Sequence, residues 1–194
     1  MTKSDGLLAA GAIVLTVVLV GCGVGNDGAA TDAAPAHEPE TEATAVVPER
    51  VADLANTQDA LFAFARALLD RIEADDLEGL MALRVSEAEF YWLVWPKLPS
   101  SQPERNLSWD YVWRDLDQKS RNSARRTIER QAGRRYELMR IEFEDETTDY
   151  GTYLVHRDAR VVVQNEAGAI LRLDLFGSVI EMNGRFKAFS LVTD

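Results

Sequence analysis

The sequence contains few of the residues that most enzyme active sites require. There is one cysteine, Cys22, and there are two histidines, His37 and His156. One thiol cannot form an intramolecular disulfide, and a single histidine after residue 50 excludes the usual zinc ligand sets and a Cys-His nucleophile from that region. No P-loop, glycine-rich dinucleotide turn or Gly-x-Ser-x-Gly elbow occurs. We therefore expect neither a metal nor a cofactor.

Lysine, arginine, phenylalanine, tyrosine and tryptophan are all missing between residues 23 and 47, where Ala, Gly, Thr, Pro and acidic residues predominate. Such a composition cannot bury enough apolar surface to offset the entropy cost of ordering, so residues 22–48 are predicted to be a disordered acidic stalk. Six acids lie between residues 23 and 49 without a base, and a net charge of about −5 of the total −11 remains for residues 50–194. This acidic balance disfavours nucleic acid as a partner.

A long apolar run extends from Leu7 to Val20, behind a short polar start that carries Lys3. A helix of that length spans about 21 Å, which is short of a hydrocarbon core of about 30 Å. The layout favours a secretory signal over a permanent transmembrane helix. The run ends in Leu19-Val20-Gly21-Cys22.

That ending resembles the lipobox of bacterial lipoproteins. In this family the cysteine thiol receives a diacylglyceryl group, the signal peptide is cut before the cysteine, and the new amino terminus is acylated, for example with palmitate. The resemblance implies a signal peptide over residues 1–21 and an exported cell-envelope protein whose membrane anchor is a lipid on Cys22. Position 23 is Gly rather than Asp, so the inner-membrane retention signal is absent. The outer membrane is the expected destination if the source has one.

Residues 49–194 are predicted to form one folded domain that begins with helices. Apolar residues recur at three- and four-residue spacing over residues 61–72, behind a cap at Asn56 or Thr57. A short second helix is expected after this one, with Asp75 at its start. These two segments have the pattern of amphipathic helices that cover a core.

Two further helices are predicted from residues that cap a helix at its start and residues that end it. Ser86 and Glu89 have capping-box spacing in front of an aromatic helix that Pro96 ends. Ser108 is expected to cap the longest helix, which Gly133 ends.

After Gly133 the apolar residues alternate with polar ones, as they do in strands. The predicted strands are Met139–Phe143, Tyr150–Arg157, Arg160–Gln164, Ile170–Met182 and Arg185–Val192. Short connections, above all the Asn183-Gly184 turn, imply antiparallel pairing. We expect an α+β fold in which amino-terminal helices pack on a curved antiparallel sheet formed by the carboxy-terminal half.

This order of elements over residues 50–194 resembles the cystatin-like cone of the nuclear transport factor two-like superfamily. In that fold a long amino-terminal helix lies in the mouth of a strongly bent sheet. The same scaffold hosts isomerases, dehydratases and binding modules, so the resemblance implies a fold and no particular function.

Aromatic residues form the most suggestive cluster in the sequence. All four tryptophans fall within 22 residues. One helix cannot bury indoles on every side, so part of the cluster is expected to line a surface or a cavity; a core between helices is the alternative. The predicted ligand- or partner-binding residues are Tyr91, Trp92, Trp95, Trp109 and Trp113.

Three groups of polar residues are further candidate sites. His156 is a candidate acid–base catalyst with Asp174 as its orienting partner, and the alternative is that both belong to a solvent-facing set of cross-strand ion pairs. The carboxylates Glu142, Glu144, Asp145 and Glu146 are candidate calcium ligands, but they lack the ligand spacing of calcium loops, and a solvated strand end and turn is the favoured interpretation. The basic residues of positions 119–135 suit the carboxy-terminal end of a helix, with contact to anionic headgroups as a weaker alternative.

Together these patterns give one leading hypothesis and two alternatives. The leading hypothesis is a membrane-anchored envelope lipoprotein with a non-enzymatic binding module for a small apolar ligand or a partner protein. The first alternative is a cone-fold isomerase, dehydratase or hydrolase-like enzyme that acts on a small organic substrate through His156 and Asp174. The second alternative is a structural protein of envelope assembly.

Overall fold

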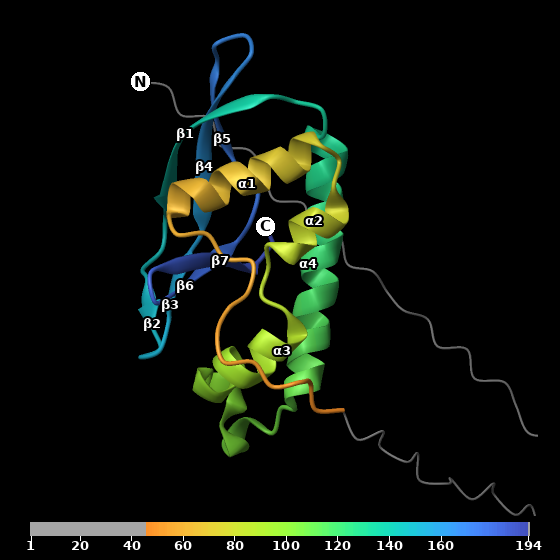
Figure 1. Cartoon of the computed structure of the whole chain (residues 1–194), viewed down its shortest axis with the longest axis vertical. Helices are drawn as coiled ribbons and strands as arrows, with labels where there is room; N and C mark the ends of the chain where they lie inside the picture. Colours follow the sequence, from red (N-terminus) through yellow and green to blue (C-terminus); the bar gives the residue numbers. More distant parts are fainter. Residues whose placement is uncertain (1–45, 194) are drawn as a thin grey trace, which may run out of the picture. The chain divides into compact units, whose positions relative to one another are not determined.

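Helices occupy the first half of the domain and antiparallel strands the second, which confirms the predicted α+β class (Figure 1). The structure is a computed structural model, and it describes residues 46–193. The predicted signal peptide, Cys22 and nearly all of the predicted stalk lie outside the described residues.

The first helix, α1 (Leu61–Glu73), buries the predicted apolar stripe, including Phe64, Leu68 and Ile72. Its cap is Ala60, so the prediction of a cap at Asn56 or Thr57 is wrong. These residues are held by the sheet instead, because Gln58 pairs with Phe186 and Thr57 accepts a hydrogen bond from Arg185. A short helix, α2 (Leu77–Ala82), follows, and the Asp76 side chain caps it by accepting from the Gly79 N–H at 2.8 Å.

The predicted capping box is confirmed at α3 (Glu87–Glu89). Ser86 Oγ accepts from the Glu89 N–H at 3.3 Å, and Glu89 Oε2 accepts from the Ser86 N–H at 2.7 Å. The chain then widens into the π-helical turn η1 (Phe90–Val94). Three short 3₁₀ turns follow, each with a proline in its first two positions: η2 (Trp95–Lys97), η3 (Pro99–Ser101) and η4 (Pro103–Arg105).

The longest helix, α4 (Trp109–Gln131), begins after Ser108 as predicted and runs along much of the domain's long axis (Figure 1). Its buried stripe contains small polar residues that hold the end of the chain. The Ser120 hydroxyl accepts from the Leu191 N–H at 3.4 Å, and the Ser123 hydroxyl accepts from the Thr193 N–H at 3.2 Å. The last segment of the chain is thereby fixed along this helix.

Within residues 46–193 the strands form two antiparallel sheets, with the orders β1-β4-β5 and β2-β3-β6-β7. The strands are β1 (Tyr136–Phe143), β2 (Thr148–Asp149), β3 (Leu154–Arg157), β4 (Ala159–Asn165), β5 (Ile170–Leu173), β6 (Ser178–Met182) and β7 (Arg185–Ser190). Backbone hydrogen bonds continue across the corner between the sheets, from the Glu144 N–H to the Asp158 carbonyl at 3.1 Å and from the Ala159 N–H to the Gly177 carbonyl at 3.4 Å. The two sheets are therefore the halves of one strongly bent layer, and their strands cross at a steep angle (Figure 1).

The prediction of one long strand over Ile170–Met182 is wrong, because the chain changes sheets in its middle. Leu175 and Phe176 are both buried, and two consecutive inward side chains break the alternation of a strand. Gly177, predicted to mark a bulge or bend, lies at this crossing. A Cβ atom there would stand 2.2 Å from the Val192 carbonyl oxygen, so only glycine allows the two backbones to approach this closely.

The interior consists of two apolar clusters of buried residues. The first lies between α1, α4 and residues of both sheets, and it includes Phe64, Leu68 and Phe176. The second lies between η1, the start of α4 and the lower sheet, and its buried members are Val85, Phe90, Val94, Trp113, Tyr153, Val155, Ile180 and Met182. Three of the five aromatic residues predicted to bind a ligand or partner, namely Trp95, Trp109 and Trp113, belong to the second cluster or pack against it.

Candidate functional site

Four of the five predicted aromatic residues lie mostly in the second apolar cluster or against one another. Trp113 is buried, and its ring centroid lies 5.4 Å from that of Phe90. Trp95 and Trp109 are partly buried against the same cluster, and Tyr91 meets Trp109 edge to face at 4.7 Å. Much of the indole surface thus belongs to a core between helices.

Trp92 differs because it lines an open groove of about 430 Å³. Its indole N–H donates to the Pro48 carbonyl at 3.1 Å, and the Arg50 guanidinium lies 5.3 Å from its ring centroid. Leu93, Pro96 and Met182 supply further apolar surface. Charged side chains reach the groove at Asp53 and Lys97, and a smaller hollow of about 220 Å³ continues past Asp53 and Met182.

The structure does not bring His156 together with Asp174. His156 Nε2 is 2.8 Å from Glu181 Oε2, and His156 Nδ1 is 2.9 Å from Thr147 Oγ1. Asp174 instead forms an ion pair with Arg160, and Asp174 Oδ1 lies 3.0 Å from Arg160 Nε. Sequence reasoning missed Glu181 because its position depends on the pairing of β3 with β6, which no local pattern specifies.

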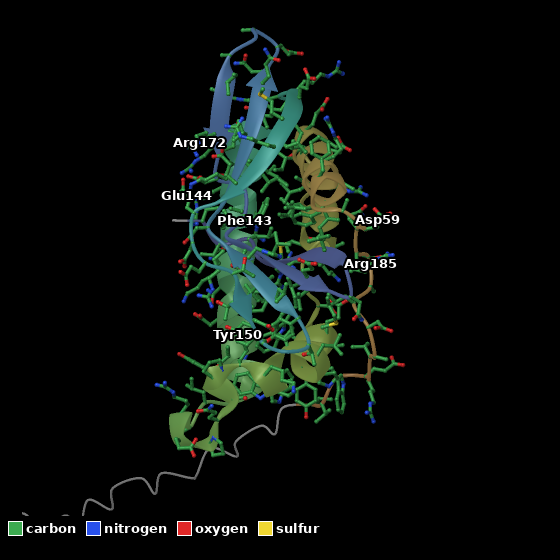
Figure 2. The ribbon with its side chains drawn as sticks, turned by 90° about the vertical axis from the view of Figure 1, so that its left-hand side faces the viewer. Asp59, Phe143, Glu144, Tyr150, Arg172 and Arg185 are labelled. Carbon is green, nitrogen blue, oxygen red and sulfur yellow. The ribbon has the colours of Figure 1, made fainter. Side chains whose placement is uncertain are left out.

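An ion-pair network covers the side of β1-β4-β5 that faces away from α1, where Arg172 and Glu144 project (Figure 2). Arg160 bridges Glu144 at 3.2 Å and Asp174 at 3.0 Å, and Arg172 pairs with Glu142. Hydrogen bonds from Arg172 and Arg140 lower the pKa of Glu142. Of the candidate calcium ligands, Glu142 and Glu144 thus bind arginines, and residues 46–193 contain no group of three or more His, Cys, Asp or Glu side chains placed to hold a metal ion.

Three of the basic residues between positions 119 and 135 form ion pairs with nearby acids. Lys119 contacts Asp115 at 2.7 Å, one turn earlier on the same helix. Arg121 reaches Glu78 of α2 at 2.9 Å, and Arg135 reaches Glu73 of α1 at 2.9 Å. These contacts connect α4 and the residues that follow it to the first two helices.

A buried ion pair joins Glu89 to Lys187, and sequence reasoning gave Glu89 only a capping role. Both side chains are 2% exposed, and the Lys187 ammonium donates to the two Glu89 oxygens at 2.9 and 2.8 Å. Glu89 also accepts from the Ala55 N–H at 2.6 Å. Burial lowers the pKa of Lys187, and the hydrogen bonds to Glu89 oppose that effect.

A second charged pair, Arg84 with Asp117, lies beside the first. The Arg84 side chain is 4% exposed and its guanidinium lies over the Trp113 ring, 4.6 Å from the centroid. Arg84, Asp117, Glu89 and Lys187 all line one cavity of about 220 Å³. Two of the hollows thus differ in character: the groove beside Trp92 has a mixed apolar and polar lining, and charged side chains line much of the cavity beside Arg84.

No family model, no curated protein and no solved structure matches this chain. Within the part of the chain that the structure describes, none of the helices combines the length and the apolar character needed to cross a membrane.

The Glu89–Lys187 pair gives a prediction for stability. Replacing Lys187 with Met leaves the Glu89 carboxylate buried without its cation, so we expect the free energy of unfolding to fall by about 3–5 kcal/mol. The double variant Glu89→Gln/Lys187→Met should be less destabilised, because no unpaired buried charge remains. Urea unfolding followed by circular dichroism measures both.

Lys119→Met is the matched control, since Lys119 belongs to an exposed pair and its loss should cost only about 0.2–1 kcal/mol. A Lys187→Met variant that unfolds at the same urea concentration as this control would contradict the structural role of the buried pair.

Proposed function

We propose that this protein is an envelope lipoprotein, held at a membrane by a lipid on Cys22, whose folded domain is a non-enzymatic binding module. The lipobox-like sequence Leu19–Cys22 supports the anchor. The groove beside Trp92 is the observation that supports binding. We also propose that the domain is a cystatin-like cone, and the contacts of α1 with both β1 and β7 of the bent layer support this.

A small, mainly apolar ligand fits the groove best. The volume of about 430 Å³ is within the range of about 300–1,000 Å³ that is usual for small-molecule sites. The Trp92 indole N–H is already bound to the Pro48 carbonyl, so the ring offers apolar surface and no free donor. Asp53 and Lys97 can fix the orientation of a polar end of the ligand.

The binding proposal predicts that a neutral apolar fluorophore, N-phenylnaphthylamine, binds the mature chain and gains fluorescence. Trp92→Ala removes a large part of the apolar wall, so we expect affinity to fall about tenfold or more, as at a binding hot spot. Trp109→Leu is the control, because Trp109 packs against Tyr91 and does not line the groove. Equal affinity of the two variants, with both folded by circular dichroism, would refute the groove as the site.

The proposed lipid anchor leads to a prediction for where the variant Cys22→Ser is found in cells. Cys22→Ser removes the thiol that carries the lipid, so the mature chain should move from the membrane fraction to the soluble fraction. Metabolic labelling with palmitate should mark the wild-type chain and leave the variant unlabelled. Palmitate incorporation into Cys22→Ser equal to that of the wild type would rule out this anchor.

One observation favours the enzyme alternative, namely the hydrogen bonds that join Thr147, His156 and Glu181. A hydroxyl, an imidazole and a carboxylate in this order can transfer a proton from the hydroxyl to the ring. If the chain is a hydrolase of this type, it cleaves chromogenic esters, and His156→Ala lowers the rate by about 10²–10⁴-fold. If it is a binding module, His156→Ala leaves the affinity for N-phenylnaphthylamine unchanged.

A further inference from the structure

Arg84 is a buried cation whose hydrogen-bonding capacity is only partly used. Its Nη2 donates to Asp117, whereas its Nε and Nη1 have no hydrogen-bond partner among the described residues. The backbone on both sides is fixed to β7, because the Leu83 carbonyl accepts from the Ala188 N–H at 2.9 Å and the Val85 N–H donates to the Ala188 carbonyl at 2.8 Å. The guanidinium is therefore held in place with donors that lack an acceptor, an arrangement that buried polar groups rarely retain.

The charges around the cavity of about 220 Å³ beside Arg84 are unevenly matched. Glu89 is fully engaged, since its two oxygens accept from Lys187, the Ala55 N–H and the Ser86 N–H. Asp117 is then the one lining carboxylate left to face the guanidinium groups of Arg84 and Arg121. Three cations and two carboxylates thus line the cavity, and the third carboxylate nearby, Glu78, pairs with Arg121 from outside the lining.

Arg121 places the second guanidinium within electrostatic reach of the first. Burial is the main cause that lowers the pKa of Arg84, Asp117 raises it, and the positive charge of Arg121 lowers it again. Arg121 itself pairs with Glu78, an exposed carboxylate on the outer side. Asp117 and Arg121 are each about one-third exposed, so solvent reaches the cavity on their side.

We propose that this cavity binds a small oxyanion, a phosphate or a short carboxylate, between the guanidinium groups of Arg84 and Arg121. Guanidinium groups bind both anions through paired N–H donors, and Arg84 has donors to spare. The volume of about 220 Å³ admits an anion of this size. The site is separate from the groove beside Trp92, and the inference does not rest on that groove.

The test is a titration of the mature chain with inorganic phosphate and, in a second series, with acetate, at an ionic strength held constant with sodium chloride. We expect saturable binding of at least one anion by calorimetry. The melting temperature should rise by about 3 °C or more at ten times the dissociation constant. The anion that gives the tighter binding identifies the chemical class of the ligand.

Two variants of α4 distinguish anion binding in the cavity from a general effect of the protein's net charge. Arg121→Gln removes one guanidinium from the cavity, whereas Arg125→Gln removes an exposed one a turn later on α4 that does not line it. Arg121→Gln should weaken binding at least tenfold and Arg125→Gln should leave it unchanged. Arg84→Lys keeps the buried charge but loses the planar fork, so if it folds it should also bind at least tenfold more weakly.

Equal effects of phosphate, acetate and chloride, or equal weakening by Arg121→Gln and Arg125→Gln, would overturn the proposal. Because N-phenylnaphthylamine binding is measured separately, failure of this site leaves the groove proposal intact, and the reverse also holds.

Discussion

The ion pair between Glu89 and Lys187 is the constraint on which the arrangement of the domain depends. It removes two charges from water, a cost of several kcal/mol for each ion that only good geometry and further hydrogen bonds can offset. The offset comes from segments that are far apart in the sequence, since Glu89 belongs to α3, Lys187 to β7 and the Ala55 N–H to the segment before α1. Separating α3 from β7 would leave a buried charge without its partner, and moving the segment before α1 would remove a hydrogen bond to Glu89. The pair therefore holds the three segments together.

Both candidate binding regions lie next to this pair. The π-helical turn η1 starts directly after Glu89, so the pair fixes the turn that presents Trp92 to the groove. On the other side, Glu89 and Lys187 form part of the wall of the cavity that holds Arg84. The hydroxyl of Tyr153 adds a further tie to η1 by donating to the Val94 carbonyl at 3.1 Å, and burial raises the pKa of that hydroxyl. The Glu89–Lys187 pair and the hydrogen bonds around it thus position both the groove beside Trp92 and the cavity beside Arg84.

The fold class and the main helices follow from local patterns. The stripe of α1, the capping box at Ser86 and the Asn183-Gly184 turn each depend on residues within a few positions of one another, so the sequence contains all the information they need. The strand predicted over Ile170–Met182 is broken between β5 and β6, because the chain leaves one sheet there and Gly177 begins the pairing with the end of β7 in the other sheet. The aromatic cluster was found by composition, but composition could not separate Trp92 from the indoles that fill the core.

The sequence by itself determined the main helices, most of the strands and the Asn183-Gly184 turn, and it supplied the lipobox-like segment that ends at Cys22. The tertiary structure alone decided which charges meet. His156 binds Glu181 rather than Asp174, and Glu89 has Lys187 as its cation, because these pairs depend on how strands align and how helices dock on them. Strand register and docking are set by the packing of the whole core, and for that reason no window of the sequence contains them.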